Sequence, residues 1–170
     1  MTRLVGFLLL QLAAALYAAR RIADSLNRTQ ALDSYCNMLE HLRGLLESDG
    51  SPMPTLLERL SGCTAGDAQA FINTLKGKMD SLGEQPFQKL WHQALLETAY
   101  RLDDNARREL ESLGTVLGRY DSVTQLDALD TCHGILRRRL TERQQGQAQD
   151  TRVTVAMSLS VSLLAGIILI

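Results

Sequence analysis

The feature that most constrains this chain is a pair of charge-free apolar stretches, one near each end of its 170 residues. Residues 4–19 read LVGFLLLQLAAALYAA, and residues 153–170 read VTVAMSLSVSLLAGIILI. As helices these stretches would reach about 24 and about 27 Å, close to the roughly 30 Å hydrocarbon core of a bilayer. A helix that is apolar all round can otherwise be buried only by a larger protein. The two ends therefore predict transmembrane segments over residues 1–21 and 153–170.

Arginines beside the two stretches predict the orientation of the chain. Those on the inner sides are Arg20, Arg21, Arg28, Arg137, Arg138, Arg139, Arg143 and Arg152. Outside the stretches lies Arg3 alone. Cytoplasmic loops carry an excess of Lys and Arg, so we expect an integral membrane protein with two spans and a cytoplasmic middle. The arginines at positions 20, 21 and 137 to 139 are candidate topology determinants or contacts for anionic lipid.

The first stretch has an alternative interpretation as a cleaved secretory signal. One basic residue precedes it, and the small residues Ala18 and Ala19 close it. The chain would then be a secreted helical binding module with a C-terminal membrane anchor. Because this alternative places the arginines before the second stretch on the wrong side of the membrane, we favour two spans around a cytosolic domain.

Between the two ends the pattern predicts helices throughout, with no alternating strand pattern and no Gly-rich nucleotide loop. We expect an all-α fold, a compact bundle of about six helices over residues 22–140, followed by a polar helical linker over 141–152. The first expected helix covers residues 27–48, and the second has Pro54 in its first turn and Gly62 at its end. The third is capped by Asp67 and the fourth is opened by Pro86. The fifth is capped by Asp103 or Asp104, and a long last helix is capped by Asp121.

Apolar residues at steps of three and four predict which helix faces are buried. On the first expected helix they are Leu32, Tyr35, Cys36, Leu39, Leu42 and Leu46. On the last they are Val123, Leu126, Leu129, Leu136 and Leu140, with His133 among them. The last set resembles a helix–helix seam, which makes self-association a further expectation.

Residues that could carry chemistry are scattered. The cysteines and histidines are Cys36, Cys63, Cys132, His41, His92 and His133, and they lack the spacing of metal ligands. The carboxylates around positions 103 to 111 alternate with arginines, which is typical of a solvated face. A net charge of −1 argues against a nucleic-acid partner. We therefore expect no catalytic residue, no metal, no cofactor and no enzymatic activity.

One segment, residues 113–125, is more distinctive. It contains two Leu-Gly pairs, followed by Asp121 and Gln125 one helical turn apart. The pattern predicts a helix stop with a close backbone crossing and an Asp cap. A second interpretation is a tight corner that presents Asp121 and Gln125 to a partner. The candidate residues of this corner motif are Leu113, Gly114, Leu117, Gly118, Asp121 and Gln125.

The arrangement Leu-Gly-x-x-Leu-Gly-x-x-Asp-x-x-x-Gln at 113–125 resembles the signature of the stage III sporulation protein AB family. Supporting marks are Pro52-Met53-Pro54 before a short helix, the helix with Trp91, and Gly166-Ile167-Ile168-Leu169 at the end. The chain has Ser158-Leu159-Ser160 where that family usually has a Leu-Gly pair.

The resemblance implies a non-enzymatic component of the sporulation channel complex between mother cell and forespore. Its soluble domain would lie on the mother-cell side and would be similar to the cytoplasmic domain of F-type platform proteins of type II secretion. The partners implied are other channel proteins, among them a secretion-type ATPase, and the lipid bilayer.

Overall fold

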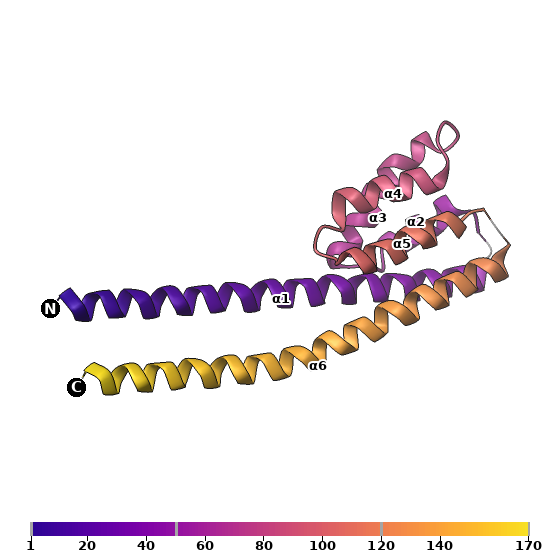
Figure 1. The fold of residues 1–170 in the computed structure, drawn as a ribbon. Helices are drawn as coiled ribbons and strands as arrows, with labels where there is room; N and C mark the ends of the chain where they lie inside the picture. The colour runs from indigo at the N-terminus through magenta and orange to yellow at the C-terminus, as the bar shows by residue number, and fades with distance from the viewer. Residues whose placement is uncertain (1, 50, 120, 170) are drawn as a thin grey trace. The chain divides into compact units, whose positions relative to one another are not determined.

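The computed structural model describes the backbone of residues 2–49, 51–119 and 121–169, and the side chains of residues 12, 15–17, 19–48, 51–119 and 121–146. Within these ranges the fold is all-α (Figure 1). The α-helices are α1 (Thr2–Asp49), α2 (Met53–Ser61), α3 (Gly66–Lys78), α4 (Phe87–Thr98), α5 (Asp104–Val116) and α6 (Ser122–Leu169), and one 3-10 helix, η1 (Met79–Ser81), follows α3.

The chain divides into two compact units. One consists of residues 28–140, and the other combines residues 1–27 with residues 141–170. In the first unit α3 contacts both α2 and α4, and α4 contacts α5. The parts of α1 and α6 that belong to this unit are joined by ion pairs, Arg43 with Asp130 at 2.6 Å and Arg137 with Asp33 at 4.0 Å. This order of contacts shows that the two segments run antiparallel.

Capping residues explain where several helices begin. Pro52 and Pro86 immediately precede α2 and α4, where the fixed φ of proline suits the start of a helix. The Asp103 carboxylate accepts a hydrogen bond of 2.7 Å from the Ala106 backbone N–H and so caps α5. The prediction that Asp67 caps α3 is wrong, because α3 already begins at Gly66.

The start of α3 is instead stabilised from another helix. The Ser34 hydroxyl, on α1, accepts a hydrogen bond of 3.3 Å from the Ala68 backbone N–H. The Asp67 carboxylate forms an ion pair of 3.0 Å with Arg101, beyond the end of α4. A local sequence pattern cannot show that a residue 34 positions away supplies the cap.

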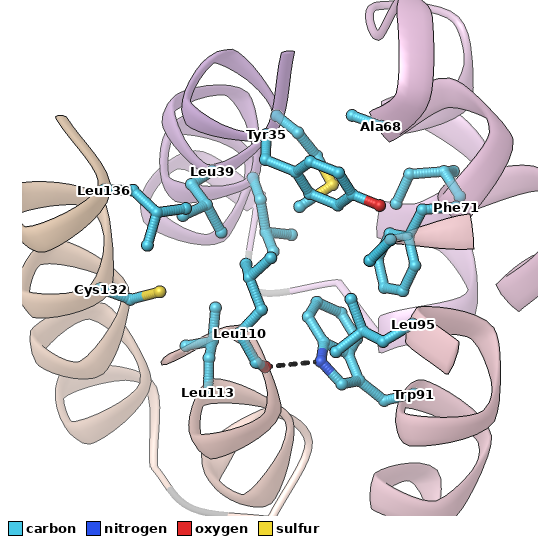
Figure 2. Close-up of a cluster of buried hydrophobic side chains, with 14 of the residues drawn as sticks. Tyr35, Leu39, Ala68, Phe71, Trp91, Leu95, Leu110, Leu113, Cys132 and Leu136 are labelled. Atoms are coloured by element: carbon cyan, nitrogen blue, oxygen red, sulfur yellow. Dashed lines mark hydrogen bonds between the residues drawn. The ribbon is translucent and has the colours of Figure 1, made fainter. Parts of the chain in front are cut away.

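Three aromatic rings that contact one another in a row form the centre of the core (Figure 2). Phe71 lies between Tyr35 and Trp91, with ring centroids 5.9 and 4.8 Å away, and it meets Trp91 edge to face at 81°. All three side chains are buried. Leu39 and Leu136 extend the same core between α1 and α6. Because Tyr35, Phe71 and Trp91 come from α1, α3 and α4, this aromatic cluster connects three helices.

The predicted apolar face of the last helix is correct except at its first position. Leu129, Leu136 and Leu140 are buried, whereas Val123 is 71% exposed. The residue of the first turn that points inward is Gln125. The seam on α6 therefore begins one turn later than its hydrophobic pattern indicates.

Of the two predicted transmembrane segments, 153–170 lies outside the described side chains, and in 1–21 only residues 12, 15–17 and 19–21 have described side chains. Across the part of the chain that is described, no helix holds a stretch of the length and apolar character needed to cross a membrane.

Trp91 and Gly114 generate the first testable prediction. A Cβ added at Gly114 would lie 2.3 Å from Trp91 Cδ1, so Gly114→Ala must displace the indole or the backbone of α5. We expect a loss of about 1–3 kcal/mol in the free energy of unfolding, as overpacking typically costs. The measurement is urea unfolding of a fragment spanning residues 22–152, monitored by the fluorescence of Trp91. Trp91 is the single tryptophan of the chain.

The matched control is Gly134→Ala on α6, where a Cβ would meet nothing within 4 Å. There alanine removes the backbone entropy cost of a helical glycine, so we expect a gain of up to about 1 kcal/mol. Equal effects of the two substitutions would contradict the assigned role of Gly114.

Candidate functional site

The corner motif joins α5 to α6 inside the unit of residues 28–140. Its first half lies at the end of α5, where Leu113 and Gly114 are buried, and Leu117 is buried just beyond. Gly114 lets the Trp91 indole lie directly on the helix backbone, and the Trp91 Nε1–H donates a hydrogen bond of 2.7 Å to the Leu110 carbonyl (Figure 2). The first glycine of the motif is therefore required for packing.

The second glycine produces the turn itself. Gly118 has a φ of +73°, in the left-handed region that residues with a Cβ rarely adopt. Leu117 leaves α5 with its backbone N–H bonded to the Leu113 carbonyl at 3.1 Å, and Gly118 then reverses the chain. The Arg119 backbone N–H bonds to the Val116 carbonyl at 3.3 Å, so Leu117, which is extended, and Gly118 are the two central residues of a type II turn, whose third residue requires a positive φ.

Asp121 begins α6 as its N-cap. Its carboxylate accepts hydrogen bonds from the Thr124 backbone N–H at 3.2 Å and from the Thr124 hydroxyl at 2.7 Å. These bonds favour the charged form, so they hold the pKa of Asp121 below its ordinary value. The side chain remains exposed to solvent, and it is the one acidic group of the motif that a partner could reach.

Gln125 closes the corner from inside. It is 8% exposed, and its side-chain oxygen accepts a hydrogen bond of 3.2 Å from the Gly118 backbone N–H. The Gln125 side chain therefore fixes the geometry of the turn. Thus the structure brings all six residues of the motif together, with Asp121 on the surface and Gln125 buried.

The candidate arginines fall into two groups. Arg20 and Arg21 are exposed on α1. On α6, Arg137 lies 4.0 Å from Asp33 and Arg139 lies 4.0 Å from Asp103, so both are close to carboxylates of the bundle. Arg138 is exposed. Sequence reasoning missed these two acidic neighbours because they are distant in the chain from α6.

The thiols differ sharply in their surroundings. Cys36 and Cys132 are buried, and burial raises their pKa values to about 11 and about 12. Cys63 is exposed. Among the described residues, no group of three or more His, Cys, Asp or Glu side chains could hold a metal ion.

Cys63 borders an open hollow of about 320 Å³ that the sequence did not indicate. The hollow lies between one face of α1, including Asn37 and His41, and the connection from α2 to α3, including Thr64 and Gly66. Its two walls are more than 20 residues apart in the chain, so no local motif could have revealed it.

Comparisons with known proteins agree with this fold. A family model described as Stage III sporulation protein AB matches residues 3–170. The chain is also similar to a solved structure titled Stage III sporulation protein AB, with a TM-score of 0.64 and 17% identity over 72% of this chain and 98% of that one. No curated protein matches the chain.

The fold and the corner define a helical-bundle protein whose first and last helices extend beyond the bundle unit. The family model covers nearly the whole sequence, including both apolar ends. The chain therefore belongs to the stage III sporulation protein AB family, as its corner motif indicated.

The cap at Asp121 gives a second prediction. We expect Asp121→Ala to lower the urea midpoint of the 22–152 fragment at pH 7, because it removes both hydrogen bonds to Thr124. Asp121→Asn, which keeps a side-chain oxygen at the cap, should lower it less.

The same pair of variants tests the pH dependence. A carboxyl group with a depressed pKa stabilises the folded state above its unfolded pKa and loses that contribution as pH falls through the folded value. The difference between wild type and Asp121→Ala should therefore narrow in acid. A difference that grows as the pH falls would contradict the cap.

The thiols give a third prediction. The thiolate is the reactive form, so buried thiols with raised pKa values stay unreactive near neutral pH. We expect iodoacetamide at pH 7.5 to alkylate Cys63 in the native protein and all three cysteines in urea, as read by peptide mass spectrometry. Rapid native labelling of Cys36 or Cys132 would show that the α1–α6 contact opens readily.

Proposed function

We propose that this protein is a non-enzymatic, membrane-anchored platform component of the sporulation channel complex between mother cell and forespore, on which a secretion-type ATPase docks. The observation that carries the proposal is the family match over residues 3–170, which includes both charge-free ends as well as the bundle between them. In this proposal residues 1–21 and 153–170 are the two membrane spans, residues 22–140 are the cytosolic domain on the mother-cell side, and residues 141–152 link that domain to the second span.

The charge pattern supports this topology. Arg20 and Arg21 follow the first apolar stretch directly, and Arg152 directly precedes the second. Side chains of this kind keep their charged ends in the interface while their stems lie along the membrane boundary. Arg138, exposed on α6, adds positive charge to the same side in this proposal.

The bundle has the properties of a rigid platform. Its core joins four helices through Tyr35, Phe71, Trp91 and Leu110, and each glycine of the corner motif has a packing or turning role. A partner that exerts force on a membrane complex needs a surface whose geometry does not change under load. A closed turn fixed by Gln125 meets this requirement.

We propose the α5–α6 corner as the docking surface. It presents the exposed Asp121 carboxylate at the start of α6 and the 71% exposed Val123 on the first turn of that helix. In this proposal Val123 is buried on binding, and Asp121 belongs to the polar rim of the contact. The arginines at positions 137 to 139 are a second candidate contact.

The test is binding of the full chain, in detergent or nanodiscs, to the secretion-type ATPase of the same complex, measured by calorimetry. We expect Val123→Asp to weaken binding by about tenfold, because it places a charge in the apolar part of the contact. Leu96→Asp, on the exposed face of α4, is the matched control and should bind like wild type.

Two outcomes would refute the proposal at different levels. Absence of any binding, with both proteins folded, would remove the ATPase platform role. Equal binding by wild type and Val123→Asp would move the docking surface away from the corner.

A further inference from the structure

The part of α1 that precedes the bundle unit carries apolar side chains that no described side chain buries. Every described side chain from Leu12 to Arg28 is exposed. Of the large apolar ones, Leu12, Leu16, Ile22 and Leu26 are between 40 and 58% exposed, and Tyr17, on another side of the helix, is 70% exposed. Isolated apolar residues on a surface need no explanation, but a face that continues along several helical turns does.

Beyond residue 19 this face is clearly one-sided. Ala19, Ile22, Ala23 and Leu26 follow the steps i, i+3, i+4 and i+7, which places them on one side of the helix. The other side is polar, and its residues are Arg20, Arg21, Asp24, Asn27 and Arg28. Helices with this division bury the apolar side against another element.

The positions also fit a heptad repeat. If Leu12, Ala19 and Leu26 occupy the a position, Ala15 and Ile22 occupy d. The neighbouring e and g positions carry no charge, and the charged residues all fall at b, c and f. We call Leu12, Ala15, Ala19, Ile22 and Leu26 the stalk stripe. Because no charge lies on or beside it, two copies of the stripe can meet without repulsion.

The chain itself does not supply a matching partner for the outer part of the stripe. Residues 141–152, which lead from the bundle to the second apolar stretch, read TERQQGQAQDTR and contain a single apolar residue, Ala148. A segment of this composition cannot bury Ile22 and Leu26. Lipid is also a poor partner, because Leu26 lies about 10 Å along the helix beyond the last residue of the charge-free stretch, with two arginines between them.

We infer that the stalk stripe pairs with the stalk stripe of a second copy of this chain, as a parallel helix pair. The inference rests on the proposed membrane anchoring, because two copies inserted in one membrane share their orientation. Each helix then meets its equivalent, and the contact is symmetric. The small residues Ala15 and Ala19 allow close approach where the helices lie in lipid, and Ile22 with Leu26 bury apolar surface where they leave it.

The experiment is disulfide cross-linking of the full chain in cell membranes, in a Cys63→Ser background that removes the exposed native thiol. Single substitutions Ile22→Cys and Leu26→Cys place a thiol on the stripe. Asp24→Cys, at an f position between them, is the matched control. Mild oxidation with copper phenanthroline is followed by non-reducing electrophoresis, and alkaline carbonate extraction of the same membranes tests insertion.

We expect a dimer band for Ile22→Cys and Leu26→Cys and its loss for Asp24→Cys. If the protein stays in the carbonate-resistant membrane but Leu26→Cys forms no dimer, or Asp24→Cys forms as much, the pairing is overturned and the membrane platform stands. If carbonate releases the protein, the proposed anchoring fails, and the parallel pairing fails with it.

Discussion

The contact between the Trp91 indole and the backbone of Gly114 is the interaction on which the arrangement of the bundle depends. The indole lies where any other residue would place a Cβ, and its N–H is bonded to the Leu110 carbonyl one turn earlier on α5. The same indole meets Phe71 edge to face, and Phe71 in turn meets Tyr35. Gly114 thus sets how closely α4 approaches α5. Through the contacts from Trp91 to Phe71 and from Phe71 to Tyr35, it also influences the position of α1.

Much of this fold can be predicted from sequence because its local signals are strong. Pro54, Pro86, Asp103 and Asp121 mark helix starts by mechanisms that act within four residues, and α2, with Pro54 in its first turn, α4, α5 and α6 begin there. The prediction fails at Asp67, whose expected role is taken by Ser34 from another helix. Helix propensities and capping patterns depend on residues that are near in the sequence. A cap supplied by a residue of another helix therefore cannot be predicted from them.

The corner shows the same limit for functional residues. The spacing of the motif predicts a turn, and the turn is found, but spacing alone does not reveal which side of the turn faces solvent. Gln125 is polar yet buried, and Val123 is apolar yet exposed. This inversion arises because the Gly118 backbone N–H needs an acceptor, and Gln125 can reach it from the inner face of the first turn of α6.

If two copies pair at the stalk stripe as inferred, and an ATPase docks on the bundle as proposed, the pairing has a consequence for how that ATPase is held. Two copies joined at their stalks would offer two bundles to the same partner. A partner with repeated binding sites would then release one bundle while the other still held it, and rebinding would occur at an effective concentration of about a millimolar. Weak individual contacts would suffice for durable attachment, so each could be made and broken during the motor's cycle without losing the motor from the membrane.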